Sequence, residues 1–268
     1  MLTLPDTPKL TACGAAVFAT NIVKCSADSP ANSMSVDNPS SEWQTTLSFL
    51  ASALGKRRRE DLLSSWGTPE PQAQWGRGGF DHHLFHVRND GEDRDKIAAH
   101  MRELISKQCN LKNIQNGIRM LYLVSEMIRN TIDHSTSDAF LGIEITDDRK
   151  ITRFAYCETG SGICAGVRET LKNNGDSRWE KEGITGLIHW ALQPGNTSKP
   201  KSNRNMGMGM TIITESSAVL NYSLSIFDAS SQIFVSDIAR GCSHFEIRRR
   251  TIRTVTAPCF MYLGELMP

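Results

Sequence analysis

Three short motifs, which occur in a fixed order along the chain, constrain its fold and function more than any other feature. They are EMIRNTIDH at residues 126–134, ETGSGI at residues 158–163 and NMGMGM at residues 205–210. The first is polar and lies within a helical pattern, whereas the other two are glycine-rich and adjoin predicted strands or helices. Each motif alone is a weak signal, but their order and the apolar segments between them predict one composite binding site.

The first motif belongs to a segment in which apolar residues recur with the period of a helix. This repeat predicts a helix over residues 116–134 with an apolar stripe formed by Ile118, Leu121, Val124, Ile128 and Ile132. Glu126, Asn130 and Asp133 are spaced i, i+4 and i+7, so they share one face of the helix. A polar face beside an apolar stripe predicts that these side chains line a cavity. The alternative is an ordinary amphipathic helix whose charged face meets solvent.

The remaining periodicity predicts an α+β fold for the second part of the chain. A helix is predicted from residue 95, with one apolar face formed by Ile97, Met101, Leu104 and Ile105, and another helix over residues 208–217. Strands are predicted at residues 139–146, 150–156, 219–227, 232–235, 244–248 and 259–263. The polar segment 164–205 is predicted to be long and irregular, with one short helix at residues 183–192.

Residues 1–95 differ in texture and are predicted to form an N-terminal extension or small subdomain of unknown role, whereas residues 96–268 form one domain. Turn-forming residues dominate 26–41, a helix is predicted over 43–63, and the composition of 67–79 favours a loop. The histidines of residues 80–86 lack a second set of metal ligands and are interpreted as structural or solvent-facing. The basic run 56–59 is interpreted as a solvated helix face.

Charge and cysteine usage exclude several classes of partner. The formal net charge is +1, which provides no general attraction to nucleic acid or to an anionic membrane. The seven cysteines are dispersed without a CxxC pair, as expected of reduced thiols in the cytoplasm. No apolar run reaches the ~20 residues that a membrane-spanning helix needs, and no signal peptide is recognised. We therefore expect a cytoplasmic protein that binds neither nucleic acid nor membrane.

The three motifs together resemble the N, G1 and G2 boxes of the GHKL ATPases, a superfamily that includes gyrase, heat-shock chaperones, sensor histidine kinases and mismatch-repair ATPases. The resemblance covers residues 95–250. It implies a two-layer α/β sandwich of the histidine-kinase-like type, in which helices cover one face of a mixed sheet. It also implies that ATP and Mg²⁺ bind between the first motif, the second motif and a mobile lid.

In the first motif, the resemblance implies that the Asn130 side chain ligates magnesium and that Glu126 orients or deprotonates the attacking water. Magnesium prefers hard oxygen ligands and takes few of them from protein. Phosphoryl transfer depends mainly on positioning and on charge neutralisation, with one group to orient the nucleophile. Asp133 resembles the acidic residue that topoisomerase-type members carry three positions after the asparagine.

The second motif follows a predicted strand and resembles the family pattern DxGxG, with Glu158 in place of the usual aspartate. The resemblance implies that this carboxylate accepts a hydrogen bond from the adenine amino group. Gly160 and Gly162 would let the backbone approach the base, and Ile163 completes the motif. The longer side chain of Glu158 implies either a shifted base or a relaxed choice of nucleotide. The alternative is a plain glycine turn after an edge strand.

The third motif resembles the phosphate-binding start of a helix. Gly207 and Gly209 would approach the phosphates through backbone amides, with Met208 and Met210 beside them. The segment before this motif resembles an ATP lid, in which Lys199 and Arg204 are candidates for contacts with the γ-phosphate. The alternatives are an ordinary glycine-rich helix start and a solvated loop.

The motifs are compatible with three functions. The first is a slow Mg²⁺-dependent ATPase, in which closure of a lid or a homodimer signals to an unidentified protein partner. The second is a protein kinase that phosphorylates a partner in trans. The third is a nucleotide-binding module that does not hydrolyse its ligand.

Overall fold

The computed structural model describes residues 16–17, 19–20, 75–77, 80–88, 94–107, 114–134, 138–146, 151–158, 160, 162–196, 208–228, 231–235, 245–248 and 260–266. The turn-rich segment predicted at 26–41 and the helix predicted at 43–63 lie outside these residues. So do Lys199, Arg204 and Gly207 of the predicted lid and third motif.

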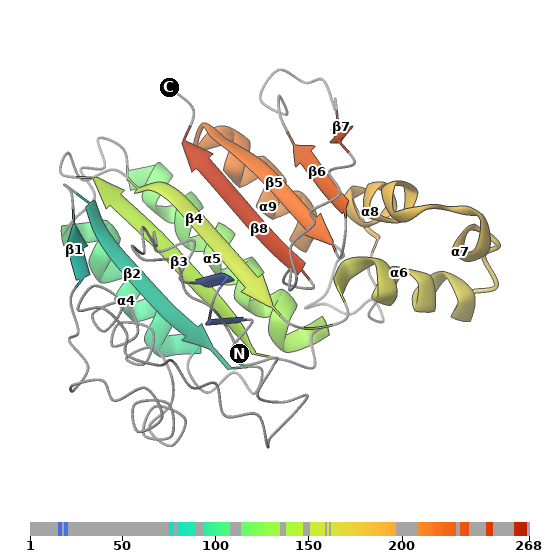
Figure 1. Ribbon diagram of the computed structural model, residues 1–268, viewed down its shortest axis with the longest axis horizontal. Helices are drawn as coiled ribbons and strands as arrows, with labels where there is room; N and C mark the ends of the chain where they lie inside the picture. The colour runs from blue at the N-terminus through green and yellow to red at the C-terminus, as the bar shows by residue number, and fades with distance from the viewer. Residues whose placement is uncertain are drawn as a thin grey trace, which may run out of the picture.

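Eight strands form one sheet in the order β1-β2-β3-β4-β8-β5-β6-β7 (Figure 1). Their bounds are Trp75–Arg77 (β1), Phe80–Val87 (β2), Ala139–Thr146 (β3), Ile151–Glu158 (β4), Tyr222–Asp228 (β5), Ser231–Val235 (β6), Phe245–Arg248 (β7) and Phe260–Leu266 (β8). Every pairing between these strands is antiparallel. The prediction of a mixed sheet is therefore wrong for the described strands. β4 and β5 point the same way and are joined through helices, but β8 lies between them and runs opposite to both.

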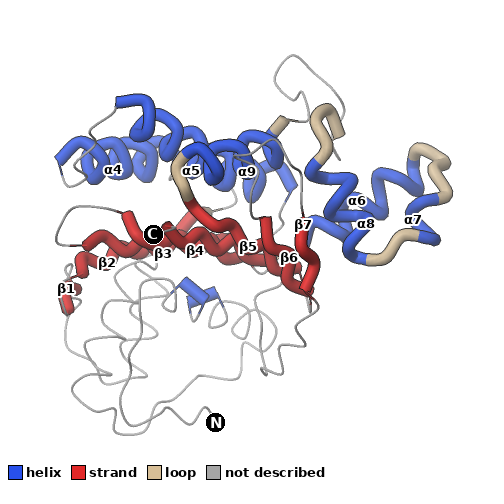
Figure 2. The backbone as a smooth tube through the Cα atoms, turned by 90° about the horizontal axis from the view of Figure 1, so that it is seen from above, coloured by secondary structure: helices blue, strands red, loops and turns tan. Residues whose placement is uncertain are grey.

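Three helices cover one face of the sheet, as predicted. They are α4 (Arg94–Lys107), α5 (Ile114–His134) and α9 (Gly209–Val219), and Figure 2 shows them as one layer beside the sheet. The core between the two layers includes Met101, Leu123, Met127, Leu141 and Phe154, which are buried. Burial of this apolar area is the main favourable contribution to the fold. No helix among the described residues is long and apolar enough to cross a membrane.

The buried side of α5 matches the predicted stripe at Val124 and Ile128, which are buried, but not along its whole length. Ile118 is 46% exposed, whereas Met120, Leu123 and Met127 are buried against the sheet. The helix is apolar on more than one side, so its sequence alone did not select the face that packs. The extents of α5 and β3 nevertheless confirm the helix and the strand predicted there.

The first described residues of the chain lie on the opposite face of the sheet. Residues 16–17 and 19–20 are helical, and Figure 2 shows this piece across the sheet from α5. The hydroxyl of Thr20 donates to the Ala16 carbonyl at 2.8 Å and lies 3.4 Å from the carbonyl oxygen of Cys157 on β4. Ala16, Ala19 and Thr20 are fully buried. The predicted two-layer arrangement thus gains a contribution from the N-terminal segment on the second face.

Residues of the predicted N-terminal extension also supply two strands. β2 pairs with β3 from Phe80↔Thr146 to Val87↔Ala139, and β1 pairs with β2. The loop predicted at 67–79 is therefore wrong at 75–77, because backbone pairing with β2 overrides the turn-forming composition. Within β2, the ring of His86 stacks on Phe140 and its Nε2 lies 2.9 Å from Asp138 Oδ2, which agrees with a structural role.

The segment after the second motif is helical rather than irregular. It contains α6 (Gly162–Asn173), α7 (Arg178–Lys181) and α8 (Ile184–Leu192), which lie beyond the β7 edge of the sheet (Figures 1 and 2). The prediction of an irregular chain is wrong for residues 164–181, because Val167 and Leu171 supply a buried face at helical spacing. The short helix predicted at 183–192 is confirmed as α8.

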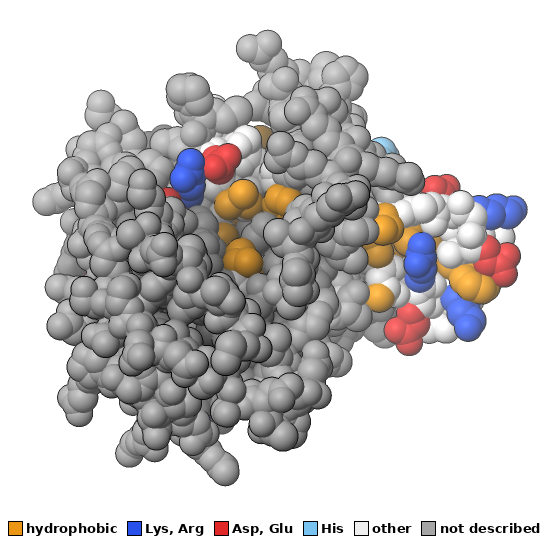
Figure 3. Space-filling view, in the orientation of Figure 1, with side chains coloured by type: hydrophobic (Ala, Val, Ile, Leu, Met, Phe, Trp, Pro, Cys, Tyr) orange, Lys and Arg blue, Asp and Glu red, His pale blue; other side chains and the backbone are white. Residues whose placement is uncertain are grey.

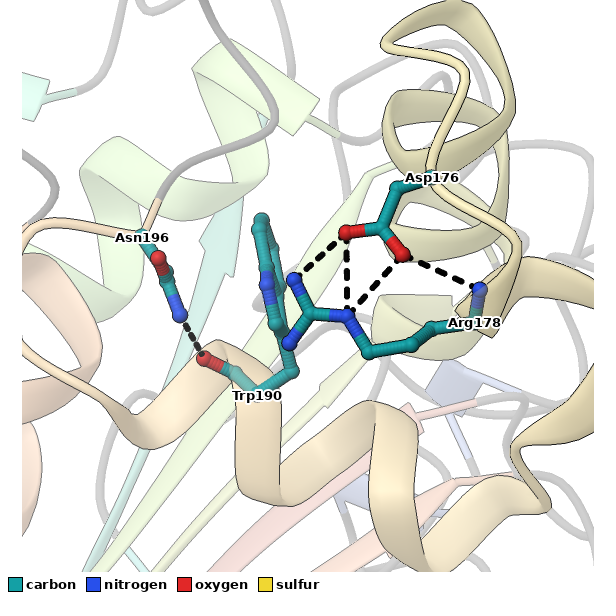
Figure 4. Close-up of polar contacts among 4 residues, drawn as sticks. All are labelled: Asp176, Arg178, Trp190 and Asn196. Carbon is teal, nitrogen blue, oxygen red and sulfur yellow. Dashed lines mark hydrogen bonds and ion pairs between the residues drawn. The ribbon is translucent and has the colours of Figure 1, made fainter.

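Local turns and polar contacts define the ends of these helices. Gly175, with φ +68, ends α6, where the Asp176 amide donates to the Leu171 carbonyl at 2.9 Å. Figure 4 shows Arg178 in contact with Asp176 and the Asn196 amide donating to the Trp190 carbonyl at 2.8 Å. Acidic, basic and hydrophobic side chains are interspersed over the exposed surface of α6–α8 (Figure 3).

Candidate functional site

The three motifs converge at one end of the sheet. β4 ends at Glu158 and β5 ends at Asp228, and both residues pair with Phe260 on β8. Residues that pair directly across antiparallel strands project to the same face. Glu158 contacts α5, so both carboxylates lie on the face that carries the helices. The C-terminal half of α5 and the first turns of α6 and α9 meet at this end.

The first and third motifs are in direct contact. A Cβ atom on Gly209 would lie 3.1 Å from Glu126 Oε2 and 3.2 Å from Asn130 Oδ1. Both distances are tighter than ordinary van der Waals contact, so a side chain at this position would require the Glu126 and Asn130 side chains to move by a few tenths of an ångström. Glu126 is 7% exposed, and its carboxylate accepts a hydrogen bond from the guanidinium of Arg129. Asn130 is half-buried beside it.

The start of α9 provides backbone donors next to these side chains. Its N-cap residue, Met208, makes no side-chain capping bond, and the first helical bond runs from the Ile212 amide to the Met208 carbonyl. The hydroxyl of Thr211, in the first turn, is buried and has no hydrogen-bond partner within the described part of the chain. A helix start whose N-cap residue makes no side-chain capping bond, with a buried hydroxyl that has no partner among the residues described, fits an anionic ligand.

The second motif is tied to α5 through a residue that the sequence did not single out. Thr131 directly follows Asn130, and its Oγ1 lies 3.1 Å from Glu158 Oε2 and 2.6 Å from the Tyr156 hydroxyl. Thr131 is fully buried, whereas Glu158 is half-buried. A threonine on the core side of a helix next to predicted site residues was the available signal, since buried hydroxyls need a partner.

A second residue missed in the sequence, Asp228, holds the turn of the second motif. Its Oδ2 accepts a hydrogen bond from the Cys164 amide at 2.8 Å, and its carboxylate also accepts one from the Ile163 amide. Gly162 has φ +78, and a Cβ there would lie 2.6 Å from Asp228 Oδ1. The glycine is thus required by a carboxylate of the chain itself. An acidic group at the start of α6 also stabilises the helix.

The electrostatics of Asp228 predict a pH-dependent contribution to stability. Burial, partly offset by its hydrogen bonds to the α6 amides, raises the pKa of Asp228 above its ordinary value of 3.8. Between that value and the folded-state pKa, the folded protein holds a proton that the unfolded chain has lost. The free energy of unfolding contributed by Asp228 therefore falls as pH rises through this interval. Chemical denaturation of wild type and Asp228→Asn at several pH values measures this contribution. The free energy of unfolding of wild type minus that of Asp228→Asn should decrease as pH rises.

Asp176 supplies a control of opposite sign. Its hydrogen bonds with Arg178 lower the pKa of Asp176 to about 2. The contribution of Asp176 to the free energy of unfolding is present above pH 3.8 and is lost as pH falls toward 2. Solvent exposure keeps this contribution small. The assignment of opposite pKa shifts to Asp228 and Asp176 predicts opposite pH trends. It would be contradicted if the loss of unfolding free energy in Asp228→Asn and in Asp176→Asn changed with pH in the same direction.

The structure also describes four other predicted site residues. Gly160 is buried in the turn after β4, Ile163 is half-buried in the first turn of α6, and Met210 packs against the core. Asp133 lies half-buried in the last turn of α5. No cluster of three or more histidine, cysteine, aspartate or glutamate side chains suited to a metal occurs among the residues described. Magnesium needs no such cluster when phosphate oxygens and water complete its shell.

No protein-family model matches the chain, and no curated protein matches it significantly.

Proposed function

We propose that this chain binds ATP with magnesium and hydrolyses it slowly, and that the resulting movement signals to a protein partner. The observation that carries the proposal is the contact of Gly209 with Glu126 and Asn130, at a helix start whose N-cap residue, Met208, makes no side-chain capping bond. This contact places the backbone amides of α9, which can donate to phosphate oxygens, beside the carboxylate of Glu126 and the amide oxygen of Asn130. This combination meets the requirements of phosphoryl transfer, which are positioning, charge neutralisation and an oriented nucleophile.

Each group has a distinct task in this proposal. The amides at the start of α9 bind phosphate oxygens, and Asn130 Oδ1 holds magnesium, which neutralises phosphate charge when bound. Glu126 orients the attacking water and accepts its proton. The guanidinium of Arg129 holds the Glu126 carboxylate in place. Glu158 accepts a hydrogen bond from the amino group of the base.

The contacts of Asp228 support a route for signalling. Its hydrogen bonds link the end of β5 to the start of α6, beside the proposed base pocket. α6–α8 extend beyond the edge of the sheet, where a partner or a second copy could meet them (Figure 1). A shift of the second motif on nucleotide binding would be passed to these helices. Lys199 and Arg204 would contact the γ-phosphate in a closed lid.

The proposal is tested by following the label of γ-labelled ATP incubated with the pure protein. We expect free phosphate to be released with magnesium and release to stop when the metal is chelated. Label on a protein would instead identify a kinase. ATP that is bound but never cleaved would identify a non-hydrolysing module.

Substitution of the proposed magnesium ligand should produce a defect that depends on the metal concentration. Asn130→Ala is expected to raise the magnesium concentration needed for half-maximal phosphate release by about tenfold, because one of few protein ligands is lost. Asn196→Ala, on the α8 side of the molecule, is the control. An unchanged magnesium requirement in Asn130→Ala would exclude Asn130 as a ligand.

A further inference from the structure

A buried chain of hydroxyl groups ends on the carboxylate of Glu158. The Tyr156 hydroxyl lies 2.6 Å from Thr131 Oγ1, which lies 3.1 Å from Glu158 Oε2. Tyr156 is on β4 two residues before Glu158, so both project to the same face of the sheet. Thr131 approaches them from α5. Two elements of the fold therefore meet at this carboxylate.

The direction of these hydrogen bonds follows from their chemistry. An ionised carboxylate only accepts, so the Thr131 hydroxyl donates its single proton to Glu158. The Tyr156 hydroxyl must then donate to the Thr131 oxygen. Both Thr131 and Tyr156 are buried, which leaves water little opportunity to replace either bond. A charge-assisted bond in such surroundings restrains the acceptor strongly.

We propose that Thr131 is a positioning residue, which orients the Glu158 carboxylate for recognition of an adenine base. This inference rests on the proposed function. Glutamate has one more rotatable bond than aspartate, and that freedom must be lost when a base binds. The bond from Thr131 removes it beforehand. The two oxygens of a carboxylate accept about four hydrogen bonds, so the single bond from Thr131 to Oε2 does not exhaust the acceptor capacity of Glu158.

The same bond selects among bases. The Watson–Crick edge of guanine offers two adjacent N–H groups, which pair best with a carboxylate that turns both oxygens toward them. Because Oε2 is restrained by Thr131, Glu158 cannot reorient freely to meet that edge. Adenine needs a single acceptor for its amino group, which a fixed carboxylate can supply. Thr131 should therefore favour ATP over GTP.

The test compares the affinities of ATP and GTP for the full chain, measured by calorimetry with magnesium. Thr131→Val, which keeps the shape but removes the hydroxyl, is expected to weaken ATP binding by about tenfold. GTP binding should weaken less, so the preference for ATP should fall. Thr131→Ser keeps the donor and should restore ATP affinity to within about threefold of wild type.

Thr214→Val is the matched control, because Thr214 is also a buried threonine but bonds only to carbonyls of its own helix. It should leave the ratio of ATP to GTP affinity unchanged. If Thr131→Val does not fold, Tyr156→Phe is used, and ATP binding should weaken by about threefold because Thr131 loses its donor.

The outcomes separate the two proposals. Wild-type protein that binds neither nucleotide would overturn the proposed function. Wild-type protein that binds ATP, with Thr131→Val or its substitute Tyr156→Phe binding ATP and GTP in the wild-type ratio, would overturn only the role of Thr131. Failure of Thr131→Ser to restore ATP affinity would also overturn the role of Thr131, because loss of the hydroxyl would then not explain the weaker binding of Thr131→Val.

Discussion

Replacing Glu126 with glutamine is expected to slow ATP turnover by about a hundredfold or more, while ATP affinity stays close to that of wild type. Glutamine has nearly the same shape and can still accept the hydrogen bond from Arg129, but it cannot take a proton from water. The start of α9, which would bind the phosphates, is unchanged. The measurements are phosphate release at saturating ATP and calorimetric binding on the same preparations.

Two comparisons make the result specific. Glu215→Gln changes the same chemical group on an exposed position of α9 and should leave turnover unchanged. Glu126→Ala should lose turnover as Glu126→Gln does, since both lack the carboxylate. Turnover in Glu126→Gln within about threefold of wild type would remove Glu126 from the chemistry.

Replacing Gly162 with alanine is expected to lower the free energy of unfolding by about 3 kcal/mol. The left-handed backbone conformation costs a non-glycine residue ~1–2 kcal/mol. In addition, the new Cβ would lie 2.6 Å from Asp228 Oδ1, and displacing a buried, hydrogen-bonded carboxylate costs a further ~1–3 kcal/mol. Denaturant unfolding of the wild type and the variant measures the sum.

Gly175 provides a control that separates the two costs. It also has a positive φ, of +68, but a Cβ there would meet nothing within 4 Å. Gly175→Ala should therefore cost only ~1 kcal/mol. Equal losses of unfolding free energy in Gly162→Ala and Gly175→Ala would mean that the Asp228 carboxylate moves away from the new Cβ atom at no measurable cost. Combining Gly162→Ala with Asp228→Ala should recover part of the loss, because the clash is removed.

Local patterns predicted most of the secondary structure around the site. The strand at 139–146 coincides with β3, and the helices containing Glu126 and Met210 were found within two residues of their observed limits. Their signals come from residues three or four apart on a helix or two apart on a strand, so the sequence displays them directly. The face of α5 that packs was predicted less well, because Ile118 and Met127 are both apolar and only the sheet distinguishes them.

The order of strands could not be predicted in the same way. β8, at the end of the chain, lies between β4 and β5, and this insertion makes every described pairing antiparallel. Pairing of distant segments depends on which edges remain free when the sheet assembles, which no local window records. The helical nature of residues 164–181 was missed for a different reason. Their polar and glycine content resembles a loop, although Val167 and Leu171 become buried on folding.

The sequence by itself determined helices α5 and α9 and strands β3, β4 and β5 around the site, and it identified Glu126, Asn130, Glu158 and Gly209 as candidate residues. Tertiary structure alone decided how these residues are supported. Thr131 meets Glu158 across 27 positions of sequence, and Asp228 meets Cys164 across 64. Hydrogen bonds depend on distance and direction in space, so partners this far apart along the chain leave no periodic trace in the sequence. Gly162 shows both aspects, because its place in a glycine turn is visible locally, whereas the carboxylate that excludes a side chain there comes from β5.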